Sequence, residues 1–206
     1  TGMGCIMGSK NLKAVAARGT MDIRIAHPVE ALEYNKRFIE QITSSKVNQT
    51  QGALGTPFIW GATNSWGGVR TRNFQYNQLE YADDVEPERI DEIATETMGP
   101  YHMTGCFGCQ VHCRAQYKIP SGPYKGKYDE GPEYTSQGAF AGEPDCRSAE
   151  TVLVGNHLVN QYGVDNLEIG SLISWAMELF ELGILTREQT DGLDLRFGND
   201  EALIEM

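Results

Sequence analysis

Apolar residues recur at helical spacing in several segments of the chain, and this pattern predicts a mainly α fold. The expected helices cover residues 28–42, 86–97, 148–162 and 169–180. Pro28 suits the first turn of the first helix because its fixed φ matches a helix and its missing N–H is not needed there. Gly163 and Gly183 follow the last two segments, where glycine commonly ends a helix.

The remaining segments lack a helical period. Residues 12–18 form a short apolar run that ends before Gly19, and with the glycine-rich residues 2–10 they predict a loop followed by a strand. Residues 44–81 keep no period of either kind, which indicates an ordered loop region with a short helix. Residues 117–128 are rich in Gly, Pro and Lys, which favours a hairpin or an open loop.

These elements divide the chain into two parts. Residues 1–20 are expected to end another domain with its last strand, and residues 21–206 are expected to form a helical domain. The chain begins at Thr1 rather than Met, and it stops within an expected helix at residues 202–206. We therefore expect the protein to continue beyond both ends of this sequence.

Composition and net charge exclude some classes of binding partner, but they do not identify a reaction. The 206 residues are 40% hydrophobic and 22% charged, which is ordinary for a globular protein. The net charge of −11 argues against nucleic acid or an anionic membrane as a partner, since both repel an acidic surface. The sequence shows no leader segment and no apolar run near the roughly 18 residues of a spanning helix. We expect a cytoplasmic protein with no membrane contact.

Three of the five cysteines lie within eight residues of one another, at Cys106, Cys109 and Cys113. This C-x2-C-x3-C spacing lets three thiolates converge on one centre, as an iron–sulfur cluster requires. Zinc is the main alternative because it accepts Cys ligands and His112 stands nearby, although a second ligand pair is not visible. Three unliganded thiols are a further alternative, at the cost of an oxidation hazard. A cubane cluster needs a fourth ligand, which we expect outside this sequence.

Several segments, in this order along the chain, resemble the aldehyde ferredoxin oxidoreductase family, and the match spans nearly the whole sequence. The matching segments are residues 4–15 (a G-x-x-M-G-S-K-N-L-K-A pattern), 71–75 (T-R-N-F), 106–113 (the cysteine loop), 131–134 (G-P-E-Y) and 176–179. The resemblance implies that residues 1–20 close a pterin-binding β domain and that residues 21–206 belong to the helical second domain. It also implies a [4Fe–4S] cluster at the cysteine loop, with a fourth cysteine downstream.

The family holds tungsten, or sometimes molybdenum, between two pterins, and a D-x-x-G-L-D motif grips one of them. The corresponding residues here run from Asn160 to Asp165 and include Gly163 and Val164. The first Asp is replaced by Asn160, which can still hydrogen-bond a pterin edge, and the Leu is replaced by Val164. A second interpretation is compatible with the first: Gly163 ends one helix, while Asp165 or Asn166 caps the next.

The G-P-E-Y turn carries the candidate catalytic residues, Glu133 and Thr135. In the aldehyde oxidases this pattern continues to a second glutamate near the metal, whereas this sequence has Thr135 there. A glutamate can transfer a proton and a threonine can only hydrogen-bond near neutral pH, so the departure puts the family reaction in doubt. Glu133 remains, either as a catalytic group or as a turn carboxylate that bonds nearby amides.

The resemblance implies an anaerobic oxidoreductase with a tungsten- or molybdenum-bispterin centre beside the cluster. Its expected reaction converts an aldehyde into a carboxylic acid, with electrons passing to ferredoxin or an electron-transfer subunit, and we consider a homodimer as its assembly. A catalytic subunit similar to the tungsten-dependent benzoyl-CoA reductases, which reduce an aromatic ring, is the alternative within this chemistry. A zinc-stabilised helical binding module without redox activity is the alternative of another class.

Overall fold

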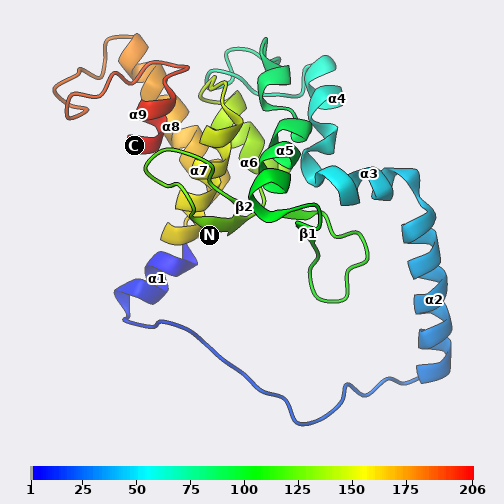
Figure 1. Cartoon of the computed structure of the whole chain (residues 1–206). Coiled ribbons are helices and arrows are strands. Elements are labelled where there is room, and N and C mark those ends of the chain that lie inside the picture. Colours follow the sequence, from blue (N-terminus) through cyan, green and yellow to red (C-terminus); the bar gives the residue numbers. More distant parts are fainter. Residues whose placement is uncertain (1) are drawn as a thin grey trace.

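Helices dominate the computed structural model, which describes residues 2–206 (Figure 1). The α-helices are α1 (Met3–Ser9), α2 (Pro28–Ser44), α3 (Lys46–Leu54), α4 (Trp60–Ser65), α5 (Pro87–Met98), α6 (Tyr134–Gln137), α7 (Ala149–Tyr162), α8 (Asn166–Glu181) and α9 (Asp200–Glu205). Shorter helical turns are η1 (Thr56–Ile59), η2 (Ala82–Val85) and the π-helical η3 (Gly138–Gly142). The mainly α fold is confirmed, and α2, α5, α7 and α8 lie where apolar spacing predicted helices.

Helix α7 lies at the centre of the fold because it contributes to both hydrophobic cores. Val152 and Val159 belong to the core that also contains Phe140 and Met177, while Leu153 packs into the second core with residues of α5 and β2. At Gly155 a Cβ atom would lie 2.7 Å from the ring of Phe140. The absence of a side chain at this position therefore lets η3 approach the axis of α7.

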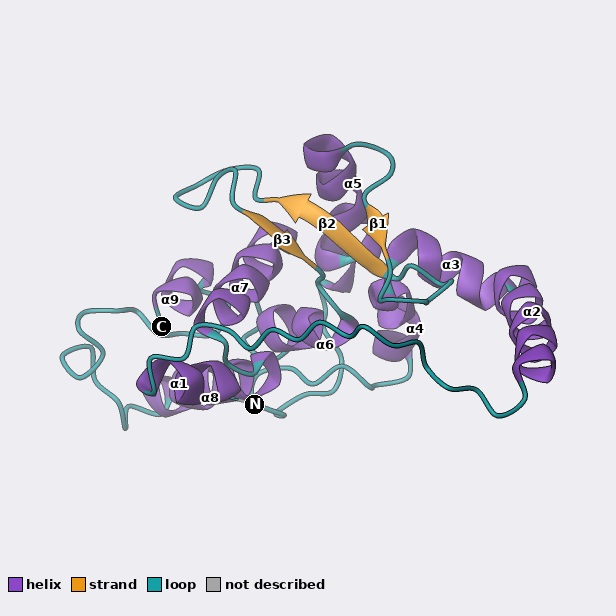
Figure 2. Ribbon diagram, turned by 90° about the horizontal axis from the view of Figure 1, so that it is seen from below, coloured by secondary structure: helices purple, strands orange, loops and turns teal. Residues whose placement is uncertain are grey.

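A small antiparallel sheet lies between α5 and α7, as Figure 2 shows. Its strands are β1 (Met103–Thr104), β2 (Arg114–Lys118) and β3 (Tyr128–Glu130), in that order across the sheet. Tyr117 and Ala115 on β2 are buried, whereas their neighbours are more exposed, which is the alternation of a strand with one face on the core. The hairpin predicted around residues 117–128 is confirmed.

The N-terminal segment differs from its prediction. Residues 3–9 form α1 where a loop was expected, and residues 12–18 form neither helix nor strand. Residues 12–18 run apart from the main body in Figure 1, and no strand of the described chain pairs with them. A strand needs a neighbour to complete its backbone hydrogen bonds, so the apolar run alone does not form one.

The region of residues 44–81 contains more helix than its sequence predicted. It holds α3, with 9 residues, η1, with 4 residues, and α4, with 6 residues. Helices this short do not fill the window of 11 to 18 residues over which a helical period is recognised. In the described part of the chain, no helix is long and apolar enough to cross a membrane.

Candidate functional site

The cysteine loop connects two paired strands. Thr104 at the end of β1 pairs with Arg114 at the start of β2, so residues 105–113 leave and re-enter the sheet at neighbouring positions. Cys106 is exposed, and Cys109 and Cys113 are half-buried. All three predicted ligands therefore lie on one loop whose base is fixed by backbone pairing.

The backbone of this loop supplies part of a thiolate environment. The amide of Val111 donates to Sγ of Cys109 at 3.4 Å, and Gly108 and His112 adopt left-handed φ values of 73° and 54°. Such amide donors are typical around iron–sulfur ligands. Burial raises the pKa of the Cys113 thiol, and the negative charge of Glu133 raises it further.

The donor chemistry of the loop fits an iron–sulfur cluster, since it offers three free cysteines and an amide aimed at one sulfur. Within residues 2–206, no three Cys, His, Asp or Glu side chains are already grouped as a metal site. The convergence of the three sulfurs on one centre thus stays a prediction.

The cysteine loop packs closely against two glycines, Gly52 in α3 and Gly55 directly after it. A Cβ atom at Gly52 would lie 2.6 Å from the carbonyl oxygen of Val111, and one at Gly55 would lie 3.0 Å from that of Cys113. Side chains at these positions would displace the loop backbone. These residues could not be recognised from the sequence, because nothing around a glycine in an aperiodic region indicates which distant segment it contacts.

Glu133 lies where the cysteine loop, η1 and the 131–134 turn meet. Its Oε2 accepts a hydrogen bond from the Thr56 hydroxyl at 2.5 Å, and that hydroxyl accepts one from the Tyr134 amide at 2.9 Å. The charge of Glu133 also acts on Cys113. Thr135, by contrast, is exposed on the first turn of α6. The two candidate catalytic residues are therefore close in sequence but differ in surroundings.

The residues from Asn160 to Asp165 form the turn between α7 and α8. Gly163 ends α7 with a left-handed φ of 67°, and Val164 packs against the first core. The Asp165 carboxylate accepts from the amides of Leu167 and Glu168 at 2.9 and 3.1 Å, so it caps α8. The capping roles are confirmed, and the pterin-binding role stays a prediction.

The α7–α8 turn contacts a segment that is distant in sequence. A Cβ atom at Gly163 would lie 3.0 Å from Cα of Gly4 in α1, and a Cβ atom at Gly4 would lie 3.0 Å from Cα of Gly163. In Figure 1, α1 lies next to the end of α7. Two segments that the resemblance connects with pterin binding thus meet backbone to backbone. The absence of a side chain at both positions allows the two backbones to approach each other this closely.

Asn160 is exposed one turn before Gly163, and its NH2 group donates to Oδ1 of Asp129 on β3 at 2.9 Å. Oδ2 of the same carboxylate lies 2.7 Å from Nδ1 of the buried His157. Asp129 could not be recognised as part of the site from the sequence, because only the packing of β3 on α7 brings it close to Asn160.

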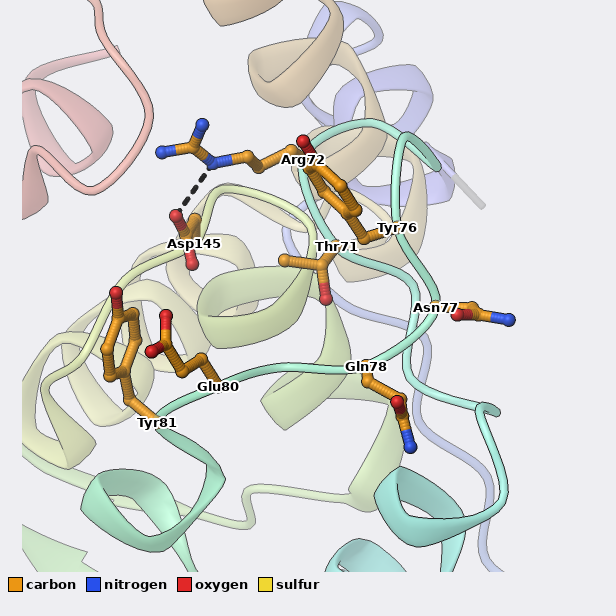
Figure 3. Close-up of a pocket in the computed structure, with 8 residues that line it drawn as sticks. All are labelled: Thr71, Arg72, Tyr76, Asn77, Gln78, Glu80, Tyr81 and Asp145. Atoms are coloured by element: carbon orange, nitrogen blue, oxygen red, sulfur yellow. Dashed lines mark hydrogen bonds and ion pairs between the residues drawn. The ribbon is translucent and has the colours of Figure 1, made fainter.

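A separate polar pocket of about 450 Å³ is shown in Figure 3. It includes part of the T-R-N-F segment, and Arg72 bonds Asp145 there at 2.8 Å. Arg72, Asn73 and Phe74 have consecutive φ values of 49°, 49° and 66°, a left-handed run that is rare outside glycine. None of the predicted site residues lines this pocket.

Comparison with known proteins agrees with the family resemblance of the sequence. The sequence model of a family described as "Aldehyde ferredoxin oxidoreductase, domains 2 & 3" matches residues 33–206. A tungsten-containing aldehyde ferredoxin oxidoreductase of Pyrococcus abyssi is 32% identical, over 98% of this chain and 32% of the relative. That of Thermococcus kodakarensis is 30% identical over the same shares.

A third relative, from Pyrococcus furiosus, has another name: it is an aliphatic sulfonate oxidoreductase, WOR-like subunit, and it is 28% identical over 100% of this chain and 32% of its own length. The chain spans about a third of the length of these relatives. The family match covers most of the described fold, including the cysteine loop and the α7–α8 turn. The chain therefore belongs to the aldehyde ferredoxin oxidoreductase family.

Proposed function

We propose that this chain is the cluster-carrying part of a tungsten- or molybdenum-pterin oxidoreductase. The observation that carries the proposal is the contact between Gly4 and Gly163, which joins two segments associated with pterin binding in the fold that also presents the cysteine loop. Cys106, Cys109 and Cys113 would hold a [4Fe–4S] cluster. Asn160, Gly163, Val164 and Asp165 would hold one pterin edge.

The proposed reaction converts an aldehyde into a carboxylic acid and passes the electrons to ferredoxin or an electron-transfer subunit. When bound, the metal–pterin group supplies two-electron chemistry at the substrate carbon, and the cluster supplies one-electron transfer. The names of the relatives support an aldehyde as substrate. The cysteine loop supports the cluster, because it offers three free cysteines within eight residues.

Glu133 is better suited than Thr135 to transfer a proton in the proposed reaction. Glu133 is half-buried and is held by the Thr56 hydroxyl, so it can accept a proton from a fixed position. Thr135 is exposed and can offer only a hydroxyl hydrogen bond. Glu133 is therefore the proposed proton-transferring group, and Thr135 is a proposed contact for the substrate.

A viologen reduction assay tests the reaction. The full-length protein, purified without oxygen and with its tungsten and iron content measured, is offered a panel of aliphatic and aromatic aldehydes. We expect aldehyde-dependent dye reduction that decreases strongly in a Glu133→Gln variant. A fully loaded wild-type protein that reduces no dye with any aldehyde would reject aldehyde oxidation.

Reduction of an aromatic ring, as in the benzoyl-CoA reductases, is the second candidate, and Thr135 favours it because the expected glutamate is missing. A Thr135→Glu variant separates the two. In an aldehyde oxidase the new carboxylate should raise the activity, since general acid–base groups contribute roughly 100- to 10,000-fold when well placed. In a ring reductase it should lower native turnover and create no aldehyde activity.

A further inference from the structure

The hydrogen bonds of Asp129 fix the side chain of Asn160 in one orientation. From this geometry we infer that Asp129 is a positioning residue, which turns the carbonyl oxygen of the Asn160 amide, rather than its NH2 group, toward a bound pterin. The inference rests on the proposed function, because it assigns how this chain replaces the aspartate of the family motif.

The Asp129 carboxylate is held by three donors. Its Oδ1 accepts from the backbone amide of Glu130 at 2.8 Å and from the Asn160 NH2 group at 2.9 Å. Its Oδ2 lies 2.7 Å from Nδ1 of His157. Asp129 is buried and lies on β3, where it pairs with Tyr117 of β2. The carboxylate is therefore rigid, and it is set by the sheet rather than by the α7–α8 turn.

The chemistry of the pair decides which atom of Asn160 remains available. A carboxylate only accepts hydrogen bonds, so the amide group that faces Asp129 must be the NH2 donor. The carbonyl oxygen then points away, and among residues 2–206 no hydrogen bond uses it. Because Asn160 is exposed, this oxygen can accept from the N–H edge of a ligand. An unrestrained asparagine could turn either group outward.

Asn160, which replaces the family aspartate, is thus chemically complementary to Asp129, because its amide can donate to that carboxylate. A second carboxylate at position 160 would stand about as close to Asp129 as the amide does now, and two like charges at that distance repel each other. His157 supports the arrangement and does not form a site of its own, since its ring is buried and packs edge-on against Tyr124 at 6.4 Å.

The test uses the full-length protein loaded with tungsten and pterin, and it measures the rate at which pterin is lost after gel filtration. Asn160→Asp restores the residue of the family motif, yet we expect it to speed pterin loss by about 10- to 100-fold, the usual effect of losing a partner that orients a ligand. Asp129→Ala should act in the same direction, because it removes the oxygen that accepts from the Asn160 NH2 group.

Glu150→Ala is the matched control. It likewise removes a carboxylate, on α7, where Glu150 accepts a hydrogen bond from the Ser121 hydroxyl at 2.7 Å, and it should leave pterin loss unchanged. Denaturant midpoints of every variant show whether folding is retained. Asn160→Asp leaves the contacts of Asp129 with Glu130 and His157 in place, so it tests the inference even if Asp129→Ala fails to fold.

The outcomes separate the inference from the proposed function. Wild-type protein that never retains pterin would reject the proposed function. Wild-type protein that retains pterin, together with an Asn160→Asp variant that retains it equally well, would overturn only the role of Asp129. A folded Asp129→Ala variant that retains pterin as well as the wild type would overturn it too.

Discussion

The cysteine loop and the α7–α8 turn carry the two sets of predicted ligands, and the fold holds them in different ways. The loop is anchored at its base by β1 and β2, while its tip at Cys106 is exposed. The turn is fixed from three directions, by the glycine crossing with α1, by the Asp165 cap and by Asp129 of β3. The turn is thus held by contacts with α1 and β3, whereas the loop is held by the sheet at its base and by the close approach of Gly52 and Gly55, and its cysteines come from one short stretch of sequence.

The loop therefore provides side chains that a bound group would arrange, whereas the turn holds its side chains in place without one. In the cysteine loop, three donors lie close together in sequence, and a bound cluster would complete their geometry, as metals commonly do when binding is coupled to folding. In the turn, the polar atoms are placed before any ligand arrives. Substitutions in the loop should therefore change metal content with little effect on the fold, and substitutions in the turn should change the stability of the fold itself.

The largest effect is expected for the cysteines. Cys106→Ser, Cys109→Ser and Cys113→Ser in the full-length protein should each remove most of the cluster iron, because serine is a poor ligand for a cubane. Iron analysis and the visible absorbance of the anaerobically purified protein measure this loss. Cys5→Ser, at an exposed cysteine outside the loop, is the control and should retain the iron of the wild type.

A loop variant that keeps full iron would show that its cysteine is not a ligand. Zinc in place of iron, in colourless wild-type protein, would favour the zinc-stabilised module instead. Either result would change the assignment of the loop cysteines as ligands of an iron–sulfur cluster.

Gly163→Ala should give the next largest effect, on stability. The variant places a Cβ atom on a residue with φ of 67° and 3.0 Å from Gly4. Left-handed backbone costs about 1 to 2 kcal/mol outside glycine, and overpacking adds about 1 to 3 kcal/mol. Gly183→Ala is the matched control, since its φ is 70° and nothing lies within 4 Å of the added atom.

Denaturant unfolding of the full-length protein measures both variants. We expect the free energy of unfolding to fall by at least about 1 kcal/mol more for Gly163→Ala than for Gly183→Ala. Equal losses would mean that backbone conformation alone matters and that the crossing with α1 contributes nothing.

Asp165→Ala should have a smaller effect. It removes the side chain that accepts from the amides of Leu167 and Glu168, and loss of such a cap costs about 0.5 to 2 kcal/mol. Asp165→Asn, which keeps an accepting oxygen, should retain most of the stability. If both variants match the wild type in denaturant unfolding, the turn is not held by this cap.

Part of this site could be predicted from the sequence because its signals are local. The spacing of the cysteines placed them on one loop, and a glycine followed by an aspartate between two helical periods predicted both the end of α7 and the cap of α8. Residues 12–18 form no strand in this structure for the complementary reason, since an apolar run does not show whether a neighbouring strand exists.

The amino-acid sequence by itself determined the longer helices α2, α5, α7 and α8, the cap of α8 and the presence of the ligand residues, because side-chain periodicity and backbone preference act over a few neighbouring positions. Only the tertiary structure decided that Gly4 meets Gly163, that Thr56 holds Glu133 and that Asp129 orients Asn160. These pairs are separated by 159, 77 and 31 positions along the chain. Contacts at such separations depend on how the helices and the small sheet pack around α7, and no local pattern encodes that packing.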